Sequence, residues 1–239
     1  MWCGVALSVA AAGALAWWLV PDEDLAAWRA GPPPHLWAAA LRQEARWRDE
    51  GVRRRVETAY VPLSALPIDL QLATLVSEDI DFFGHGPIDV DAVWEALQER
   101  SRPGARLRGA STISQQLAKA LFLSGERTLW RKLREARLAW WLERRLGKRR
   151  ILELYLNVVE FGPGLYGAEV AARHYYGISA ADLDAPQASG LVAAIPSPGR
   201  DNPTTVSRRW QLRKATIMRR AARAEWLRER LLAFRGAPG

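Results

Sequence analysis

The first twenty residues form the most hydrophobic stretch of the chain. Residues 1–20 carry no charged side chain and are rich in Ala, Leu, Val and Trp. About twenty apolar residues are enough for a helix to cross a bilayer, and Trp17 and Trp18 stand near the end, where interfacial tryptophan is common. The pattern predicts a transmembrane anchor over 1–20. A buried core helix and a cleaved signal peptide are the alternatives, although the basic residues that open a signal peptide are missing.

Beyond this stretch, hydrophobic positions recur with helical spacing almost throughout. Residues from about 35 to 55 predict an amphipathic helix close to the membrane surface, and residues from about 206 to 232 predict a second, basic helix. An apolar face at Ile68, Leu72 and Leu75 brings another helix up to an acidic stretch. Strand-like alternation is rare, so we expect a mainly α fold.

Prolines divide the chain after the predicted anchor. A cluster at 32–34 marks one break, and Pro62 and Pro67 mark the entry to the main domain. We therefore expect a juxtamembrane amphipathic linker or jaw over 21–59 and a catalytic or binding domain over 60–239.

Composition narrows the partners without choosing one. The 34 Lys and Arg exceed the 26 Asp and Glu, giving a net charge of +8, which suits a nucleic acid, an anionic lipid or a phosphorylated substrate. Cys3 is the only cysteine, so an intrachain disulfide framework is excluded. No Cys/His cluster with zinc-ligand spacing is present.

The acidic stretch is the first candidate for chemistry. Glu78 and Asp79 are followed closely by Phe82 and Phe83. Aromatic side chains beside a carboxylate can desolvate it and suit it to act as a general base. The alternative is an ordinary helix end with surface acids.

A second candidate begins after Gly109. Ser111, Gln115 and Lys119 are spaced four residues apart, so they share one face of a helix, with Ser111 as the expected N-cap. That face and the free N–H groups of the helix end could bind an oligosaccharide or a phosphate. An amphipathic surface helix remains the alternative.

Two further segments follow. The cations from Arg127 to Arg134 surround Glu135, and Arg131 and Glu135 form an i,i+4 pair. Such a pair is either a modest surface salt bridge or part of a pyrophosphate site, because arginine binds phosphate bidentately. The segment 151–157 and the Gly/Pro-rich loop after it indicate structural support.

Each segment alone is weakly diagnostic, but their order is specific. The set resembles the peptidoglycan glycosyltransferases, family 51, over about residues 60–203. The matching motifs are Glu-Asp-x-x-Phe-x-x-His from Glu78, Ser-Thr-Ile-Ser-Gln-Gln-x-x-Lys from Ser111, Arg-Lys-x-x-Glu from Arg131, and Ile-Leu-Glu-x-Tyr-Leu-Asn from Ile151. No transpeptidase domain follows, so the chain is most similar to the monofunctional biosynthetic enzymes.

The resemblance implies a lysozyme-like glycosyltransferase head with a hydrophobic jaw that dips into the bilayer. It implies lipid II and the growing glycan chain as substrates, inverting transfer, and release of undecaprenyl pyrophosphate. The protein would be a single-pass protein of the bacterial inner membrane with its catalytic domain on the periplasmic or outer face. Other cell-wall synthesis proteins could be partners, and nucleic acid is not expected.

The resemblance also implies residue roles. Glu78 falls on the general base that deprotonates the acceptor hydroxyl, and Glu135 on the second acid at the donor phosphate. The positions that fall on the lining of the donor and its pyrophosphate are Ser111, Gln115, Lys119, Arg127, Arg134 and Asn202. Mg²⁺ or Mn²⁺ at the pyrophosphate is compatible with the family, but the sequence predicts no metal-ligand set.

Several positions depart from the family pattern. They are Pro87, Ala110, Ala120, Arg134 and Gln187. Two other functions therefore stay open: a lysozyme-like lytic hydrolase, and a non-catalytic membrane protein that binds lipid II or a synthesis partner. The cations near Glu135 argue against the hydrolase, since a neutral glycan offers them no counter-charge.

Overall fold

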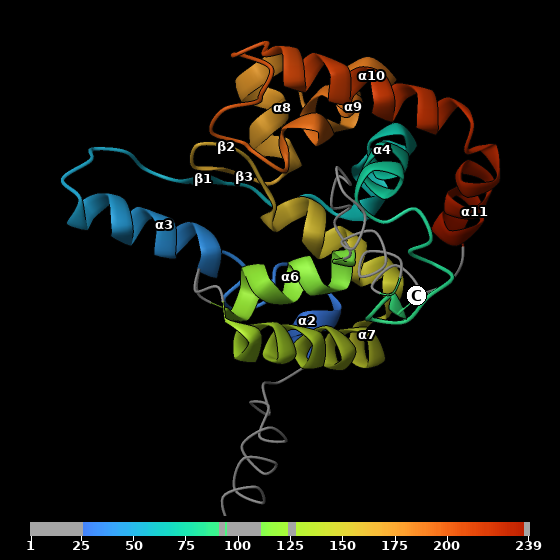
Figure 1. The fold of residues 1–239 in the computed structure, drawn as a ribbon, viewed down its shortest axis with the longest axis horizontal. Helices are drawn as coiled ribbons and strands as arrows, with labels where there is room; N and C mark the ends of the chain where they lie inside the picture. The colour runs from blue at the N-terminus through green and yellow to red at the C-terminus, as the bar shows by residue number, and fades with distance from the viewer. Residues whose placement is uncertain (1–25, 91–93, 95–110, 124–127, 237–239) are drawn as a thin grey trace, which may run out of the picture.

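The computed structural model describes residues 26–90, 94, 111–123 and 128–236, and these are mainly helical, as predicted (Figure 1). The predicted anchor over 1–20 lies outside the described residues. None of the helices described is both long enough and apolar enough to cross a membrane.

Helices and three short strands make up the described part of the chain. In order they are α2 (Ala26–Arg29), α3 (Ala38–Asp49), β1 (Glu57–Thr58), η1 (Leu63–Ala65), α4 (Ile68–Glu78), α6 (Ile113–Phe122), α7 (Leu129–Val158), β2 (Glu160–Gly162), β3 (Leu165–Tyr166), α8 (Ala168–Tyr176), η2 (Ala180–Asp182), α9 (Ala185–Ala194), α10 (Arg208–Ala222) and α11 (Glu225–Gly236).

Two groups of helices are visible in Figure 1. Helices α4, α8, α9 and α10 lie in its upper part, while α2, α6 and the first part of α7 lie below. Helix α4 is the centre of the upper group, because every residue from Leu70 to Val76 is buried and α9, α10 and α11 pack against it. The two polar residues in this buried run, Gln71 and Thr74, bond backbone carbonyls, and the helix ends at Glu78, as the apolar face predicted.

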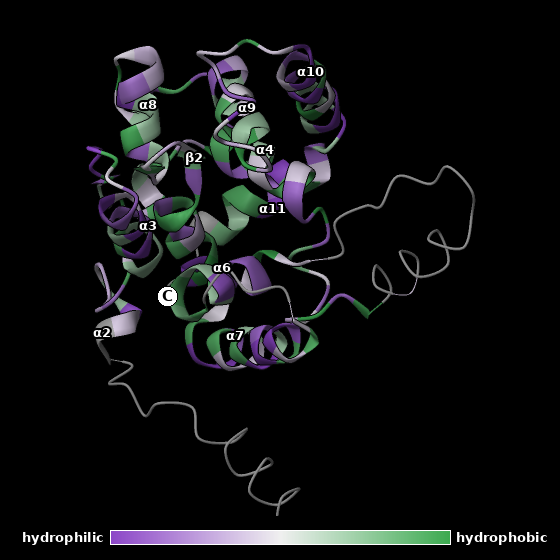
Figure 2. Cartoon of the chain, turned by 60° about the vertical axis from the view of Figure 1, so that its left-hand side comes forward, coloured by the Kyte–Doolittle hydropathy of each residue, from purple (hydrophilic) through white to green (hydrophobic). Residues whose placement is uncertain are grey.

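Helix α7 connects the two groups through a break. Gly147 has a φ of 72°, in the left-handed region that glycine adopts at little cost, so the segment is two helices joined there. The first part packs along α6, and Figure 2 shows hydrophobic and hydrophilic residues alternating along it. The second part, after Gly147, enters the core with Leu152, Leu154 and Leu156 fully buried.

The predicted structural role of the segment 151–157 is confirmed. Glu153 Oε2 accepts a hydrogen bond from the backbone N–H of Leu63 at 2.7 Å. Asn157 bonds both backbone groups of Val61, accepting from its N–H at 2.7 Å and donating to its carbonyl at 2.8 Å. These side chains replace the strand partner that the extended chain before α4 would otherwise need.

The described part of the predicted linker over 21–59, residues 26–59, packs closely on the rest of the fold. Strand β1 pairs in parallel with β3, and β3 pairs antiparallel with β2. Trp28 is fully buried, stacks on Phe122 with ring centroids 5.6 Å apart, and its carbonyl accepts a hydrogen bond from Arg150 Nε at 2.7 Å. Whether this segment forms a separate domain stays a prediction.

Two predicted helices have different bounds in the structure. The helix expected over 35–55 is α3, which ends at Asp49, two residues before Gly51. The helix expected over 206–232 is two helices, α10 and α11, because the chain turns after Ala222 to bury Leu227 and Leu231. Periodicity identified the helical segments but not the turn between them.

Candidate active site

Glu78 is the last residue of α4, and its two carboxylate oxygens have different surroundings. Oε1 accepts hydrogen bonds from Ser77 Oγ at 2.9 Å and from Arg213 Nη2 at 3.0 Å. Oε2 accepts a longer bond, of 3.3 Å, from Gln116 Nε2. The side chain is only 10% exposed. Oε1 is therefore held by a cation and a hydroxyl, while Oε2 is the oxygen more open to a new proton.

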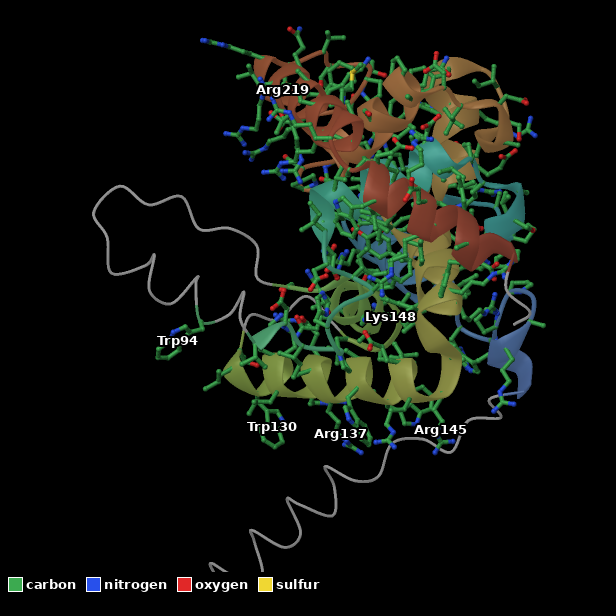
Figure 3. The ribbon with its side chains drawn as sticks, turned by 90° about the vertical axis from the view of Figure 1, so that its right-hand side faces the viewer. Trp94, Trp130, Arg137, Arg145, Lys148 and Arg219 are labelled. Carbon is green, nitrogen blue, oxygen red and sulfur yellow. The ribbon has the colours of Figure 1, made fainter. Side chains whose placement is uncertain are left out.

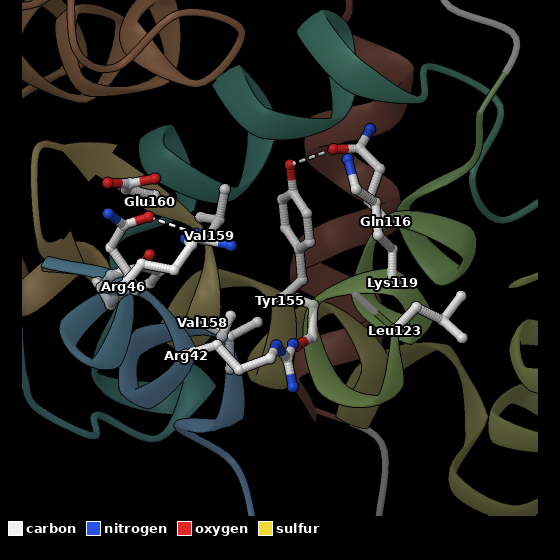
Figure 4. A pocket seen from close by; sticks show the side chains of 13 residues that line it. Arg42, Arg46, Gln116, Lys119, Leu123, Tyr155, Val158, Val159 and Glu160 are labelled. Atoms are coloured by element: carbon white, nitrogen blue, oxygen red, sulfur yellow. Dashed lines mark hydrogen bonds between the residues drawn. The ribbon is translucent and has the colours of Figure 1, made fainter. Parts of the chain in front are cut away.

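Gln116 is oriented from behind by a tyrosine. The hydroxyl of Tyr155 donates to Gln116 Oε1 at 2.9 Å (Figure 4). This leaves the amide nitrogen of Gln116 to donate to Glu78. Burial, and then the nearby charge of Glu78, raise the pKa of Tyr155 well above its usual value. The tyrosine therefore stays protonated and acts as a donor.

The aromatic pair after Glu78 packs into the fold. Phe82 is fully buried and contacts Phe83 edge to face, with centroids 5.3 Å apart. Phe83 in turn contacts Phe234 of α11 at 4.8 Å. The groups bonded to Glu78 are polar, so the expected desolvation by these two rings finds no support.

Asp79 ties the loop after α4 to the beginning of α6. Its Oδ1 lies 2.6 Å from His85 Nε2, and its Oδ2 accepts the backbone N–H of Ile113 at 2.9 Å. Burial lowers the pKa of His85, but the hydrogen bonds to Asp79 and to the Gly86 carbonyl outweigh it and raise that pKa to about 9. His85 is thus a cation paired with Asp79 near neutral pH.

Helix α6 begins one residue later than expected. Thr112, rather than Ser111, is the N-cap, and it forms a capping box with Gln115. Gln115 is 3% exposed, so its side chain serves the cap rather than an open surface. The Thr-x-x-Gln spacing of a capping box was present in the sequence and could have corrected the assignment. Gln116, which contacts Glu78, was missed.

Glu135 lies in α7 and is bound by two cations. Its Oε2 accepts from Arg131 Nη1 at 2.6 Å, and its Oε1 is paired with Lys132 Nζ. Lys132 also donates to Ser111 Oγ at 2.8 Å, so Ser111 joins this group. Glu135 is only 3% exposed. The predicted Arg131–Glu135 pair is confirmed, and its burial distinguishes it from a surface salt bridge.

The other predicted cations lie elsewhere. Arg134 is exposed, and its charge, after burial, helps to lower the pKa of Arg137 on the same helix. Lys119 is exposed and lines a cavity between α3 and α6. Arg127 falls outside the described residues. Among the residues that the structure describes, the cations paired with Glu135 are Arg131 and Lys132.

Asn202 is buried in the loop between α9 and α10. It donates to the Pro198 carbonyl at 2.9 Å and accepts the backbone N–H groups of Thr204 and Thr205, each at 3.0 Å. The side chain thus stabilises a turn, and its predicted contact with substrate stays a prediction.

Both acids are connected through the first turns of α6. Ser111, just before this helix, belongs to the Glu135 group, and Gln116, on its second turn, belongs to the Glu78 group. In the Glu78 group, the carboxylate oxygen Oε2 can accept a proton. In the Glu135 group, the cations Arg131 and Lys132 can bind an anion. This division of charge is what a transfer reaction with an anionic leaving group requires.

The described residues hold no cluster of three or more His, Cys, Asp or Glu that could bind a metal ion. The two cations on Glu135 would also repel a divalent cation there. Binding of Mg²⁺ or Mn²⁺ at the pyrophosphate stays a prediction, and no step below depends on one.

Comparison with known proteins defines the class first. The sequence pattern of the family described as Transglycosylase matches residues 46–222, most of the chain. The chain therefore belongs to the transglycosylase family, whose members transfer glycosyl groups.

The relatives narrow this class. The chain is 46% identical over 151 residues to a biosynthetic peptidoglycan transglycosylase of Nitrosospira multiformis, covering 63% of this chain and 66% of the relative. It is 50% identical over 139 residues to the protein of that name from Methylobacillus flagellatus, covering 58% of this chain and 61% of the relative. The identity to the biosynthetic peptidoglycan transglycosylase of Azoarcus sp. is 41% over 197 residues, covering 82% of this chain and 85% of the relative. The family expected from the ordered motifs, the peptidoglycan glycosyltransferases, is confirmed.

Proposed function

We propose that this protein is a peptidoglycan glycosyltransferase that polymerises lipid II into glycan strands by inverting transfer, with release of undecaprenyl pyrophosphate. The observation that carries the proposal is the contrast between the two acids connected by α6. Glu78 keeps one weakly held oxygen, whereas Glu135 is saturated by cations.

The first step assigned to this site is removal of a proton. Glu78 Oε2 takes the proton from the 4-hydroxyl of the acceptor sugar as that oxygen attacks the anomeric carbon of the donor. Inversion requires the base and the leaving group to lie on opposite faces of the donor sugar. Arg213 and Gln116 hold the carboxylate in one orientation, so it need not reorganise during the reaction.

The second step is stabilisation of the leaving group. Negative charge grows on the departing pyrophosphate in the transition state. Arg131 and Lys132, which are paired with Glu135, can also donate hydrogen bonds to the oxygens of the pyrophosphate. Ser111 adds a hydroxyl beside Lys132. Arginine suits this role because its planar fork binds phosphate oxygens in pairs.

An exposed surface of α7 that combines tryptophan and arginine supports a lipid-linked substrate. Leu129 is 79% exposed and Trp130 57% exposed on α7, and Trp140 is also exposed. Figure 3 shows Trp130, Arg137 and Arg145 pointing out of the same side of α7. Exposed tryptophan beside arginine is typical of an interfacial helix. We therefore retain the proposal of a single-pass inner-membrane protein with a lysozyme-like head on the outer face.

Two departures from the family pattern leave the acids intact. The carbonyl of Pro87 accepts Thr112 Oγ1 at 2.7 Å, and the carbonyl of Ala120 accepts Arg42 Nη2 at 2.7 Å. Both contacts use the backbone, so neither substitution removes a partner of Glu78.

The test is polymerisation of labelled lipid II by the purified full chain. We expect Glu78→Gln to lower the rate by about 10²- to 10⁴-fold, the range for a general base. Glu229→Gln is the matched control, because Glu229 is exposed on α11. Polymer formation unaffected by Glu78→Gln would refute the proposal, and release of soluble fragments from isolated cell walls would favour the lytic hydrolase.

A further inference from the structure

Lys148 and Glu143 form an ion pair across the break in α7. Glu143 belongs to the first part of the helix and Lys148 to the second, and Lys148 Nζ lies 2.7 Å from Glu143 Oε1. The two side chains are only 18% and 10% exposed. In Figure 3, Lys148 lies above the first part of α7, whereas Trp130, Arg137 and Arg145 point down from it. The steps proposed above use neither member of this pair.

Glu143 connects the pair to α6. Ser114, in the first turn of α6, is fully buried and donates from Oγ to Glu143 Oε1, the oxygen that Lys148 also binds. Ser114 lies two residues before Gln116, which binds Glu78. The pair therefore holds the helix that both acid groups contact, on a side of it that is turned away from solvent.

Lys148 connects the pair to the loop after Glu78. Its Nζ lies 4.5 Å from the centroid of the Phe82 ring, within the range of a cation–π contact. Phe82 is fully buried and follows Glu78 closely in the chain. The ammonium group thus contacts an aromatic ring as well as a carboxylate. A neutral side chain of similar length would keep the packing on Phe82 and lose both charge contacts.

The break at Gly147 gives the angle between the two parts of α7 a large effect. Apart from its own neighbours in the chain, no described residue has an atom within 4 Å of the place that a side chain of Gly147 would occupy. Packing at Gly147 itself therefore does not hold the angle. Glu135 lies about 18 Å along the helix from Gly147, so a change of about 3° would move it by about 1 Å. A misplacement of about 1 Å can cost about 10²-fold in rate.

We propose that the Lys148–Glu143 pair fixes the angle at this break and thereby positions Glu135 and its cations relative to Glu78. Both members are positioning residues, because they act through α6 and the two parts of α7. This inference rests on the proposed function and adds two residues to it. A buried ion pair suits the role, since its contacts are directional while its desolvation cost offsets much of its contribution to stability.

The first experiment neutralises the pair in the full chain and measures polymerisation of lipid II. We expect Glu143→Gln/Lys148→Met to lower kcat about 10- to 100-fold, with KM and the melting temperature nearly unchanged. Lys148→Arg keeps the charge and should retain most of the rate. The matched control is Asp69→Asn/Arg228→Met, which neutralises an ion pair of 2.5 Å between α4 and α11. Equal kcat values for the two double variants, or a loss of kcat that parallels a loss of melting temperature, would overturn the inference.

A distance measurement tests the inference without turnover. Cys3 is the only cysteine, so after Cys3→Ser spin labels can be placed at Leu133→Cys on α7 and Arg219→Cys on α10, where both side chains are exposed. We expect the distribution of distances between the labels to be broader or shifted when the pair is neutralised, and unchanged in the control double variant. An unchanged distribution in both would overturn the inference. If the wild-type protein forms no polymer, the proposed function alone is refuted, and this comparison still decides whether the pair fixes the break.

Discussion

Arg213 Nη2 lies 3.0 Å from Glu78 Oε1, although the two residues are 135 positions apart in the chain. The same nitrogen lies 3.1 Å from Ser77 Oγ. Helix α10 thus supplies a cation to the end of α4, where the proposed base is located. Because it binds only one of the two oxygens, it fixes the orientation of the carboxylate without occupying Oε2.

Removal of this cation should affect turnover more than binding. We expect Arg213→Gln to lower kcat about 10- to 100-fold with little change in KM, because the carboxylate loses its orientation and not its substrate contacts. Arg213→Lys should recover part of the rate, since it keeps the charge but loses the fork. Steady-state polymerisation kinetics test this, with exposed Arg208→Gln as control. A pure KM effect would contradict the positioning role.

Tyr155 should act through Gln116. Tyr155→Phe keeps the ring but frees the amide of Gln116 to turn away from Glu78. We expect kcat to fall about tenfold, and the free energy of unfolding to fall by about 1 kcal/mol, as for one lost hydrogen bond. Gln116→Ala should lower kcat by a similar factor, and the double variant should be no worse than either single one. Additive losses in that cycle would show that the two side chains act independently.

The cations of α7 should differ in importance. Lys132→Met removes a ligand of Glu135, so we expect kcat to fall about 10²- to 10³-fold, the cost of removing one charge-stabilising donor. Arg134→Met removes the same charge from an exposed position, so it should cost less than about threefold. Single-turnover rates and melting temperatures would be compared for both. Equal losses would favour the assignment of Arg134 made from the resemblance.

The His85–Asp79 pair should make stability depend on pH. Folding raises the pKa of His85 from 6.5 to about 9, so its contribution is complete below about pH 6.5 and is lost as the pH rises through 9. At pH 6 the free energy of unfolding of the wild-type protein should exceed that of His85→Gln by about 1 to 2 kcal/mol, allowing for solvent screening. At pH 10 the two free energies should be almost equal. Denaturant unfolding at both values measures this. An advantage that does not change with pH would mean that the histidine is not charged in the folded protein.

Local features of the site were predictable from sequence. The Arg131–Glu135 pair needs only helical spacing, and the helix ending at Glu78 needs only its apolar face. The assignment of Gln115 rather than Gln116 was also a local error. Successive residues lie about 100° apart around a helix, so Gln115 bonds the N-cap while Gln116 faces Glu78.

The distant contacts were not predictable. Arg213 reaches Glu78 because α10 packs across α4, and no periodicity within either helix encodes that crossing. The pairing of β1 with β3 similarly joins Glu57 to Leu165, in strands of two residues each. Strands this short have no alternation to detect. Composition likewise could not show that two cations on α3 and one on α6 would line one cavity.

Helix α6 has one further consequence, for inhibition. Since Ser111 belongs to one acid group and Gln116 to the other, a rigid rotation of this single helix would misalign both halves of the reaction together. A small molecule that binds between α3 and α6 could stop synthesis without competing with the sugar substrates for either carboxylate. Such a compound would act on the helix that both acid groups contact, and not on either acid itself.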